Sequence, residues 1–455
     1  MSIDAVIAAF LARPEVQDAE RLLLAYSGGV DSEVLLTALN QALESEQKPQ
    51  LIAVHINHQL QDAAEDFVLH CERRTTELHI PFQLIKVDAK ASGGESPEAV
   101  ARNKRYEALA GVMNPGDILL TAQHQDDQAE TLLLQLLRGS GLAGLVGMPS
   151  MKAFSDGYHA RPFLKVSRSE IESYAREHQL GWVEDPTNQT TEIPRNFLRH
   201  KALPLFEEAF SEPHKSLAQS AEHLQIEFEL MRQLLYEKLQ LVLTSNAFEP
   251  WLGKALSIEL LSGLSKSLQE ALLRHWCASR ELPRPSLEQL ERIFSEVINA
   301  SEDAQPQIKI GELLLIRSGK ELYLVREGLL NPEGYSINLN PKEVIEQSIE
   351  LPGTGMNLKL SQSEGRGLFL SESGSYFVRT RIEGDKAHPN ERGHSRALSK
   401  LFQEYALPVC LRDHWPIIAD VRTNAIIAVP GLFIAKGYAA QEGEQGLSFE
   451  FVEAC

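Results

Sequence analysis

The first 200 residues alternate short apolar runs with stretches in which apolar residues recur every three or four positions. The apolar runs are 22–26, 51–56, 81–87 and 117–122. Strands that alternate with amphipathic helices, at a spacing of roughly 30 residues, are typical of βαβ units with parallel strands. The pattern therefore predicts an α/β fold with a doubly wound parallel sheet, whose ligands bind beyond the carboxyl ends of the strands.

The pattern changes near Pro204, where a helical period replaces the alternation. Residues 214–243 predict one long amphipathic helix, and shorter helical periods follow at 265–282 and 286–300. Two β-rich runs within 311–327 flank Ser318-Gly319 and predict a hairpin. Residues 328–343 carry Pro, Gly and Asn without a strong period, so we expect a linker there.

The chain is 455 residues long, two to three times the usual length of one domain. We expect a catalytic domain over residues 1–212 with the parallel sheet. A mainly helical middle domain follows over 213–330, and a smaller α+β domain over 345–455.

Composition limits the class of protein. Hydrophobic residues make up 43% and charged residues 24% of the chain, and no apolar run approaches the roughly 20 residues that cross a bilayer. The first residues lack the basic start and apolar core of a secretory signal. We therefore expect a cytoplasmic protein without a membrane partner. The four cysteines form no C-x-x-C pair, which argues against zinc-ribbon, iron–sulfur and redox sites.

The net charge of −19 speaks against nucleic-acid binding, because neutralising phosphates requires a basic surface. Binding depends on local patches rather than on the sum, however. Within 377–420 basic residues alternate with acids, and this segment is either an RNA-contacting strip or an ordinary mixed surface. Its basic residues are Arg379, Arg381, Lys386, Arg392, Arg396, Lys400 and Arg412.

The strongest chemical signal is AYSGGVDS at residues 25–32, between a predicted strand and a predicted helix. Gly28 and Gly29 let backbone N–H groups approach an anion, Ser27 and Ser32 offer hydroxyls, and the helix directs its positive end toward the ligand. We interpret this segment as a phosphate cradle. It is not a Walker A loop, because no lysine follows the glycines and Asp31 places a carboxylate there instead. The alternative is a turn that merely joins strand to helix.

A second polar cluster, TAQHQDDQAET at 121–131, follows the fourth apolar run. Asp127 and Glu130 are three residues apart, so they share one face of a helix and are able to grip one cation together. Acidic residues are also favourable at a helix N-terminus for electrostatic reasons alone, which is the alternative interpretation.

The S-G-G-x-D-S segment resembles the pyrophosphate-binding loop of the PP-loop ATP pyrophosphatases, which cleave ATP between its α- and β-phosphates. The resemblance implies that ATP is bound by Ser27, Gly28, Gly29, Val30, Asp31 and Ser32, with Asp31 helping to hold Mg²⁺. Val30 stands where many members have Pro, which leaves the anion contacts unchanged.

The order of further motifs resembles the tRNA(Ile)-lysidine synthetase family. These motifs are 53–60, 101–106, 121–131, 182–188 and 195–204, and the segment 377–420 resembles the C-terminal domain of its longer members. The resemblance implies that Asp127 and Glu130 recognise free L-lysine and that Asp127 acts as the base. Arg102 and Arg105 suit nucleotide contact, and the residues that would line the lysine or RNA side are His124, Asn188, Arg195 and Arg199.

The family resemblance implies an ATP-dependent reaction on the wobble cytidine of a CAU-anticodon isoleucine tRNA. It also implies that the domains at 213–330 and 345–455 contact this RNA. The base is adenylated, and lysine then displaces AMP to give lysidine. Three alternatives remain open. One is a PP-loop tRNA thiolase, which generally uses paired cysteines. Another is a PP-loop amidotransferase, which needs an ammonia source. The third is a nucleotide-binding sensor that catalyses no reaction.

Overall fold

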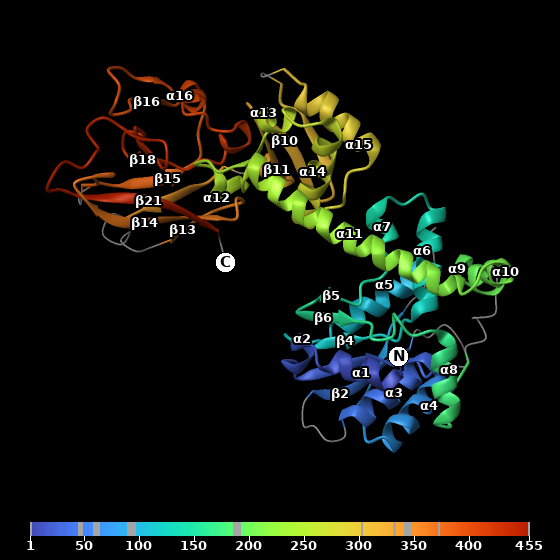
Figure 1. Ribbon diagram of the computed structural model, residues 1–455. Helices are drawn as coiled ribbons and strands as arrows, with labels where there is room; N and C mark the ends of the chain where they lie inside the picture. The colour runs from blue at the N-terminus through green and yellow to red at the C-terminus, as the bar shows by residue number, and fades with distance from the viewer. Residues whose placement is uncertain are drawn as a thin grey trace. The chain divides into compact units, whose positions relative to one another are not determined.

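The structure is a computed structural model in which the chain forms two compact units, Met1–Met231 and Arg232–Cys455 (Figure 1). Each unit has its own hydrophobic cores. The structure describes residues 2–43, 49–57, 64–88, 97–184, 193–301, 304–330, 334–340, 348–371 and 374–453.

The first unit is built on a six-stranded sheet with the strand order β3-β2-β1-β4-β6-β5. The strands are β1 (Arg21–Ala25), β2 (Gln50–Asn57), β3 (Phe82–Lys86), β4 (Ile118–Leu120), β5 (Met151–Phe154) and β6 (Gly157–Ala160). The helices are α1 (Ile3–Leu11), α2 (Pro14–Gln17), α3 (Val30–Leu43), α4 (Ala64–Glu77), α5 (Pro97–Ala110), α6 (Gln125–Leu137), α7 (Leu142–Leu145), α8 (Arg168–Glu177), α9 (Pro194–Phe197), the π-helical turn η2 (Leu198–Ala202) and α10 (Leu203–Ala209).

The predicted doubly wound sheet is confirmed. Five strands pair in parallel, and only the edge strand β5 runs antiparallel, to β6. Alternate residues of β1 enter different cores: Leu22 and Leu24 pack with α1, α3 and α8, whereas Leu23 packs with residues of α5. A strand buried on both faces reads as a continuous apolar run, which is why 22–26 carries no polar alternation.

The connections between the strands place a ligand site at the carboxyl ends of β1 and β4. β1 lies between β2 and β4, so the chain leaves β1 toward one side of the sheet and returns through β4 on the other. The loops after β1 and β4 therefore meet at a topological switch point, where ligands bind in open α/β sheets. These loops contain the phosphate cradle and the 121–131 cluster.

Helix α11 (Pro213–Val242) confirms the predicted long helix, and it contributes residues to both units. The second unit continues with α12 (Glu249–Leu252), α13 (Ile258–Ser262), α14 (Lys266–Ser279), α15 (Leu287–Arg292) and the π-helical η3 (Ile293–Ile298). Its first sheet has the order β7-β8-β11-β10-β9. These strands are β7 (Leu243–Thr244), β8 (Ala255–Ser257), β9 (Gln307–Ile310), β10 (Leu313–Ser318) and β11 (Glu321–Arg326).

The predicted hairpin is present as β10 and β11, which pair antiparallel around Gly319 with φ of 58°. Side chains alternate between two cores along both strands. Leu315 and Leu324 pack with α14 and η3, whereas Ile316 and Tyr323 enter the core that holds Trp415. This period of two gives the sheet two apolar faces.

The C-terminal part is rich in strands, as predicted. After the 3₁₀ turn η4 (Glu327–Leu330) come β12 (Ser336–Leu339), β13 (Ser348–Leu351), β14 (Met356–Glu364), β15 (Tyr376–Arg379), β16 (Lys386–Ala387), β17 (Arg396–Ala397), α16 (Leu398–Glu404), η5 (Val409–Leu411), β18 (Ile417–Asp420), β19 (Ile426–Val429), β20 (Phe433–Ile434) and β21 (Gln445–Glu453). They form the sheets β12-β15-β18-β19-β20, β13-β14-β21 and β16-β17.

The linker prediction for 328–343 is wrong at Ser336–Leu339. These residues form β12 and pair antiparallel with β15, because Ile337 and Leu339 supply apolar side chains to the core.

Trp251 of α12 stacks on Trp415 with ring centroids 5.0 Å apart, within the same core. The division of this unit into a middle and a C-terminal domain, with boundaries near 330 and 345, stays a prediction.

No helix among the described residues is long and apolar enough to cross a membrane.

Candidate active site at the carboxyl ends of β1 and β4

The phosphate cradle follows β1 and ends at the first turn of α3. Gly28 has φ of 82°, a conformation that side chains other than glycine rarely adopt. The two serine hydroxyls lie 3.1 Å apart, and that of Ser32 donates to the carbonyl of Gly29 at 3.0 Å. The loop thus holds both serine hydroxyls and the start of α3 around one point, as an anion site requires.

Close packing behind Gly28 fixes the loop. A Cβ at this position would lie 3.0 Å from the sulfur of Cys71 and 3.1 Å from a methyl of Val183. The backbone N–H of Val183 donates to the carbonyl of Gly28 at 3.0 Å. Any larger residue at position 28 would therefore push the loop out of its conformation.

A cleft of about 640 Å³ opens in front of this loop. That volume lies in the range of small-molecule and cofactor sites. The cleft is lined by residues of the β1 loop, α5, the β4 loop, α8 and the segments near 183 and 199. They are Ala25, Ser27, Gly29, Val30, Asp31, Ser32, Arg102, Arg105, Tyr106, Leu109, Thr121, Ala122, Gln123, Asp127, Arg168, Trp182, Val183, Glu184, Arg199 and His200.

Asp31 lies in this cleft with an unsatisfied oxygen. Its Oδ1 is buried without a hydrogen bond from any residue that the structure describes. Nε2 of His124 is 3.8 Å from Oδ1, and a guanidinium nitrogen of Arg168 is 3.6 Å from Oδ2. Burial raises the pKa of the Asp31 carboxyl, although the charges of His124 and Arg168 oppose the rise. A buried oxygen in this state is suited to a cation.

His124 links Asp31 to Asp127. It is the N-cap residue of α6, and Asp127 completes a capping box by accepting the His124 backbone N–H at 3.1 Å. Nδ1 of His124 accepts the backbone N–H of Asp126, so Nε2 carries the proton in the neutral ring. Nε2 lies 3.5 Å from Oδ2 of Asp127. The helical cap therefore positions two cleft carboxylates around one imidazole.

Asp127 and Glu130 share one face of α6, as predicted, and two arginines cover that face. Arg199 donates to Glu130 at 2.6 Å and to Asp127 at 3.1 Å, and Arg195 donates to Glu130 at 2.7 Å. Burial acts to raise the pKa of Asp127, but His124, Arg195, Arg199 and the His124 amide outweigh burial and lower it. Asp127 therefore remains a carboxylate at neutral pH.

The two carboxylates differ in access. Asp127 lines the cleft, whereas the side chain of Glu130 is 1% exposed and is not among the lining residues. The assignment of both residues to lysine contact stays a prediction, and the geometry favours Asp127 for the direct contact.

The α5 side of the cleft is basic. Arg102 and Arg105 line it, and Arg102 also lies over the ring of Tyr106, 5.3 Å from its centroid. Burial lowers the pKa of Arg105, with Arg102 acting in the same direction. Crowded guanidinium groups at a cleft wall favour a phosphate ligand.

The structure brings together the predicted site residues that it describes, and it adds several that were not predicted. Nine line the cleft: Ser27, Gly29, Val30, Asp31, Ser32, Arg102, Arg105, Asp127 and Arg199. Gly28 shapes the loop, His124 caps α6 beside Asp31 and Asp127, and Arg195 pairs with Glu130 and Asp127. Asn188 lies outside the described residues. Arg168, Thr121, Gln123 and Trp182 were missed. Thr121 and Gln123 follow the end of β4, where ligands bind in such sheets, whereas Arg168 begins α8 and Trp182 comes after that helix.

Comparison with known proteins identifies the family of this chain. The tRNA(Ile)-lysidine synthase of Vibrio cholerae serotype O1 is 37% identical over 425 residues, which cover 93% of this chain and 93% of the relative. The chain belongs to the tRNA(Ile)-lysidine synthase family. Relatives of the same name from Vibrio vulnificus and Coxiella burnetii are 37% and 35% identical over 93% and 94% of the chain, and cover 94% and 92% of their own lengths.

Three domain families characteristic of tRNA(Ile)-lysidine synthases match successive parts of the chain. They are a PP-loop domain at residues 2–206, a TilS substrate binding domain at 256–323 and a TilS substrate C-terminal domain at 377–451. The first match contains the cleft and every site residue discussed above. None of the motifs that carry the family resemblance lies within 205–330, and the match at 256–323 extends the resemblance to that part of the chain.

The basic strip predicted within 377–420 needs a correction. Arg379 is buried and makes a bidentate ion pair with Asp385 at 2.7 and 2.8 Å, so it stabilises the fold and presents no surface to RNA. Arg381 pairs with Asp413, and Arg392 and Arg396 pair with Glu404. Lys386 and Lys400 are exposed. A contribution of the six residues other than Arg379 to RNA binding stays a prediction.

Proposed function

We propose that this chain joins free L-lysine to C2 of the wobble cytidine of an isoleucine tRNA with a CAU anticodon, at the expense of ATP. The products are lysidine in the RNA, AMP and pyrophosphate. One observation carries the proposal: the phosphate cradle and the Asp127 carboxylate face the same cleft, in a chain of the tRNA(Ile)-lysidine synthase family.

In the first step the cradle holds the β- and γ-phosphates of ATP. Backbone N–H groups at Gly29 and the start of α3 face the anion, and Ser27 and Ser32 supply hydroxyls. The C2 carbonyl oxygen of the cytidine attacks the α-phosphorus, an O–P bond forms, and pyrophosphate leaves. Arg102, Arg105 and Arg168 neutralise the charge that builds on the phosphates. Positioning and electrostatics carry this step.

Mg²⁺ fits the residues around Asp31. The unsatisfied Oδ1 atom offers a hard oxygen ligand, and phosphate oxygens and water complete the coordination of such ions. Bound Mg²⁺ would neutralise phosphate charge. Asp31 would coordinate the ion, and His124 would keep the Asp31 carboxylate in position.

In the second step the ε-amine of lysine attacks C2, the C2–O bond to AMP breaks, and one proton leaves the amine. Asp127 lines the cleft and binds the ammonium form of lysine through Oδ1, the oxygen that Arg199 contacts in this structure. Lysine therefore competes with Arg199 for one oxygen. The lowered pKa of Asp127 makes it a strong electrostatic contact for the ammonium group and a weak base, so the proton goes from the amine to water.

Glu130 acts through the arginines. Its two carboxylate oxygens accept hydrogen bonds from the Nε–H groups of Arg195 and Arg199. These contacts set the orientation of both guanidinium groups. We propose that Glu130 is a positioning residue and that Arg195 and Arg199 line the lysine side of the site, with Asn188 on the same side by family resemblance. The enzyme would work in the cytoplasm, where ATP and tRNA occur together.

The thiolase alternative needs cysteines at the reacting base. Cys71 is buried behind Gly28 and its pKa is raised to about 12 by burial, so it stays a thiol. Cys277 and Cys410 belong to the second unit. No cysteine lines the described cleft, and lysine ligation is the better supported reaction.

One assay tests the proposal. Purified chain is mixed with ATP, Mg²⁺ and radiolabelled lysine, with or without a full-length tRNA transcript carrying a CAU anticodon. We expect pyrophosphate release that requires the RNA, and label in the RNA that requires lysine. Pyrophosphate release without label in the RNA would point to the other PP-loop reactions.

A further inference from the structure

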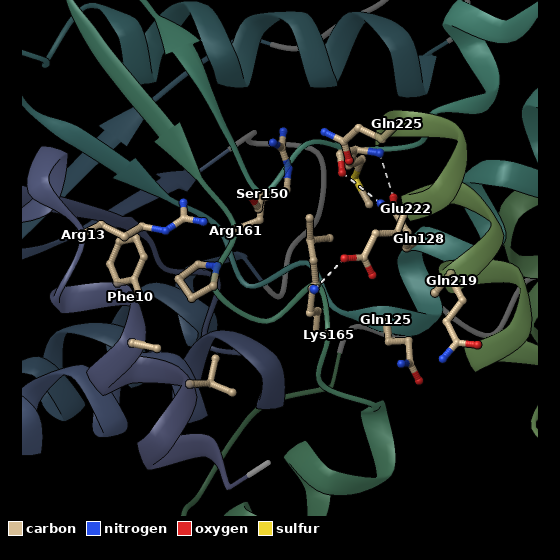
Figure 2. Close-up of a pocket in the computed structure, with 16 residues that line it drawn as sticks. Phe10, Arg13, Gln125, Gln128, Ser150, Arg161, Lys165, Gln219, Glu222 and Gln225 are labelled. Atoms are coloured by element: carbon tan, nitrogen blue, oxygen red, sulfur yellow. Dashed lines mark hydrogen bonds and ion pairs between the residues drawn. The ribbon is translucent and has the colours of Figure 1, made fainter. Parts of the chain in front are cut away.

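A second groove of about 330 Å³ lies in the first unit beside the cleft (Figure 2). Its walls are α1, the first turn of α6, the segments 148–150 and 161–165, and the first part of α11. No residue of this groove was predicted as a site residue.

The groove and the cleft share a wall. Gln125 and Gln128 of α6 line the groove, whereas Asp127, on the other side of the same turn, lines the cleft. Arg161 also lines the groove, and its Nε donates at 2.7 Å to Gln123, which lines the cleft. A ligand in the groove would therefore lie next to the substrates in the cleft.

The charges in the groove favour an anion. Three of its four charged lining residues are cations: Arg13, Arg161 and Lys165, against Glu222. Lys165 pairs with Glu222 at 2.6 Å. The Arg13 side chain has no hydrogen bond or ion pair with any residue that the structure describes, although its backbone bonds to Phe10, Val16 and Gln17. This excess of positive charge stands out in a chain with a net charge of −19.

The remaining lining residues suit a base. Phe10 and Pro162 offer flat apolar surfaces, and Figure 2 draws Arg13 beside Phe10. Gln125 and Gln219 extend their amide ends in the same direction in that view. Neither amide hydrogen-bonds to another described residue, whereas Gln128 is occupied by the backbone of Met148 at both its oxygen and its nitrogen. Figure 2 draws Phe10 and Arg13 at one end of the groove and the two free amides at the other, with the Lys165–Glu222 pair between them. A groove with an apolar ring and a guanidinium at one end and free amides at the other suits a splayed nucleotide that spans it.

The other substrates fit the groove poorly. The ammonium group of lysine needs a carboxylate, and the single one here already holds Lys165. The triphosphate of ATP has its cradle in the cleft.

We propose that this groove binds the unpaired nucleotide that follows the reacting cytidine in the substrate RNA, and that Gln125 and Gln219 read its base. The inference rests on the proposed function, under which that base is the adenine of the CAU anticodon. A glutamine amide forms two hydrogen bonds with adenine N6 and N7, which makes adenine the matching base. Arg13 contacts the backbone phosphate of the same nucleotide.

The test measures RNA binding by the full chain without ATP or lysine. Two anticodon stem-loop RNAs are compared, one with the CAU anticodon and one in which purine, which lacks the 6-amino group, replaces the adenine. We expect wild type to prefer the adenine RNA, and Gln125→Ala or Gln219→Ala to weaken its binding by roughly 5- to 100-fold while removing the preference. Gln17→Ala, at an exposed glutamine of α2, is the matched control.

Arg13→Ala separates phosphate contact from base reading. This variant should weaken both RNAs equally and reduce the salt dependence of binding, because a phosphate contact carries no sequence information. Arg73→Ala, at an exposed arginine of α4, should change neither.

The proposal is overturned if wild type binds both RNAs equally, or if the glutamine variants keep the affinity and preference of wild type. Uniform weakening by the glutamine variants, with the preference retained, also contradicts base reading. Lysine incorporation by wild type into full-length tRNA is measured separately. Its failure contradicts the proposed function, whereas intact incorporation with unaltered variant binding contradicts the groove alone.

Discussion

The Nε atom of Arg199 lies 2.6 Å from Oε1 of Glu130, a carboxylate with only 1% of its side chain exposed. The same guanidinium reaches Oδ1 of Asp127 at 3.1 Å. One arginine therefore ties a buried carboxylate to one that faces the cleft. This arrangement separates the two members of the acidic pair into a substrate contact and a positioning residue.

Asp127→Asn should raise the KM for lysine roughly tenfold to a hundredfold, because it removes a charge-assisted contact with the ammonium group. Base activation does not use that contact, so adenylated RNA should accumulate when lysine is present. Steady-state kinetics and trapping of the adenylated RNA measure the two effects. Unchanged lysine kinetics would refute the assignment, and loss of adenylation would place Asp127 at the metal instead.

Glu130→Gln should lower both the free energy of unfolding and the use of lysine as a substrate. The variant leaves two partly buried guanidinium groups without their shared charge, which costs on the order of 1.5–3 kcal/mol. Denaturant unfolding measures this loss, and Glu77→Gln, at a half-exposed carboxylate of α4, is the control that should stay near wild type. A variant as stable as wild type would contradict the positioning role.

The sequence predicts the site well where a residue's role depends on local geometry. Gly28, Asp31 and the Asp127–Glu130 spacing follow from a strand, a turn and a helical period, and the structure places them as those patterns require. The covering of Glu130 by Arg195 and Arg199 was not predictable, because these arginines lie 65 and 69 positions away and no local sequence pattern indicates the contact. The missed strand β12 has the same cause, since Ile337 gains its burial from strands far along the chain.

Asp31→Asn should abolish RNA-dependent pyrophosphate release without lowering the melting temperature. Its Oδ1 is buried and unsatisfied, and burial raises its pKa, so the carboxylate contributes little to folding. Calorimetry and a pyrophosphate assay check the two parts. Asp66→Asn, at an exposed position of α4, is the matched control. Near-normal pyrophosphate release by Asp31→Asn would contradict the metal assignment.

His159 should make the first unit sensitive to acid. It is fully buried beside Arg161, and burial lowers its pKa to about 3. Since the unfolded imidazole titrates near 6.5, protons favour the unfolded state as the pH falls below that value. The stability that the neutral ring provides is therefore complete above pH 6.5 and is lost toward pH 3. Between pH 7 and pH 5 the loss should be about 2 kcal/mol.

His159→Asn should flatten this part of the stability curve. Chemical denaturation at pH 7, 6 and 5 compares how steeply the free energy of unfolding falls with pH, with His79→Asn, at an exposed histidine, as the control. A variant whose stability falls with pH as steeply as wild type would show that other groups dominate.

The most direct test of the account is the transfer of radiolabelled lysine to a full-length tRNA with a CAU anticodon, in the presence of ATP and Mg²⁺. We predict label in the RNA, with one pyrophosphate and one AMP formed for each lysine transferred, and no label when the wobble cytidine is replaced by uridine. ATP cleavage that leaves the RNA unlabelled, or lysine transfer that ignores the wobble base, would contradict it.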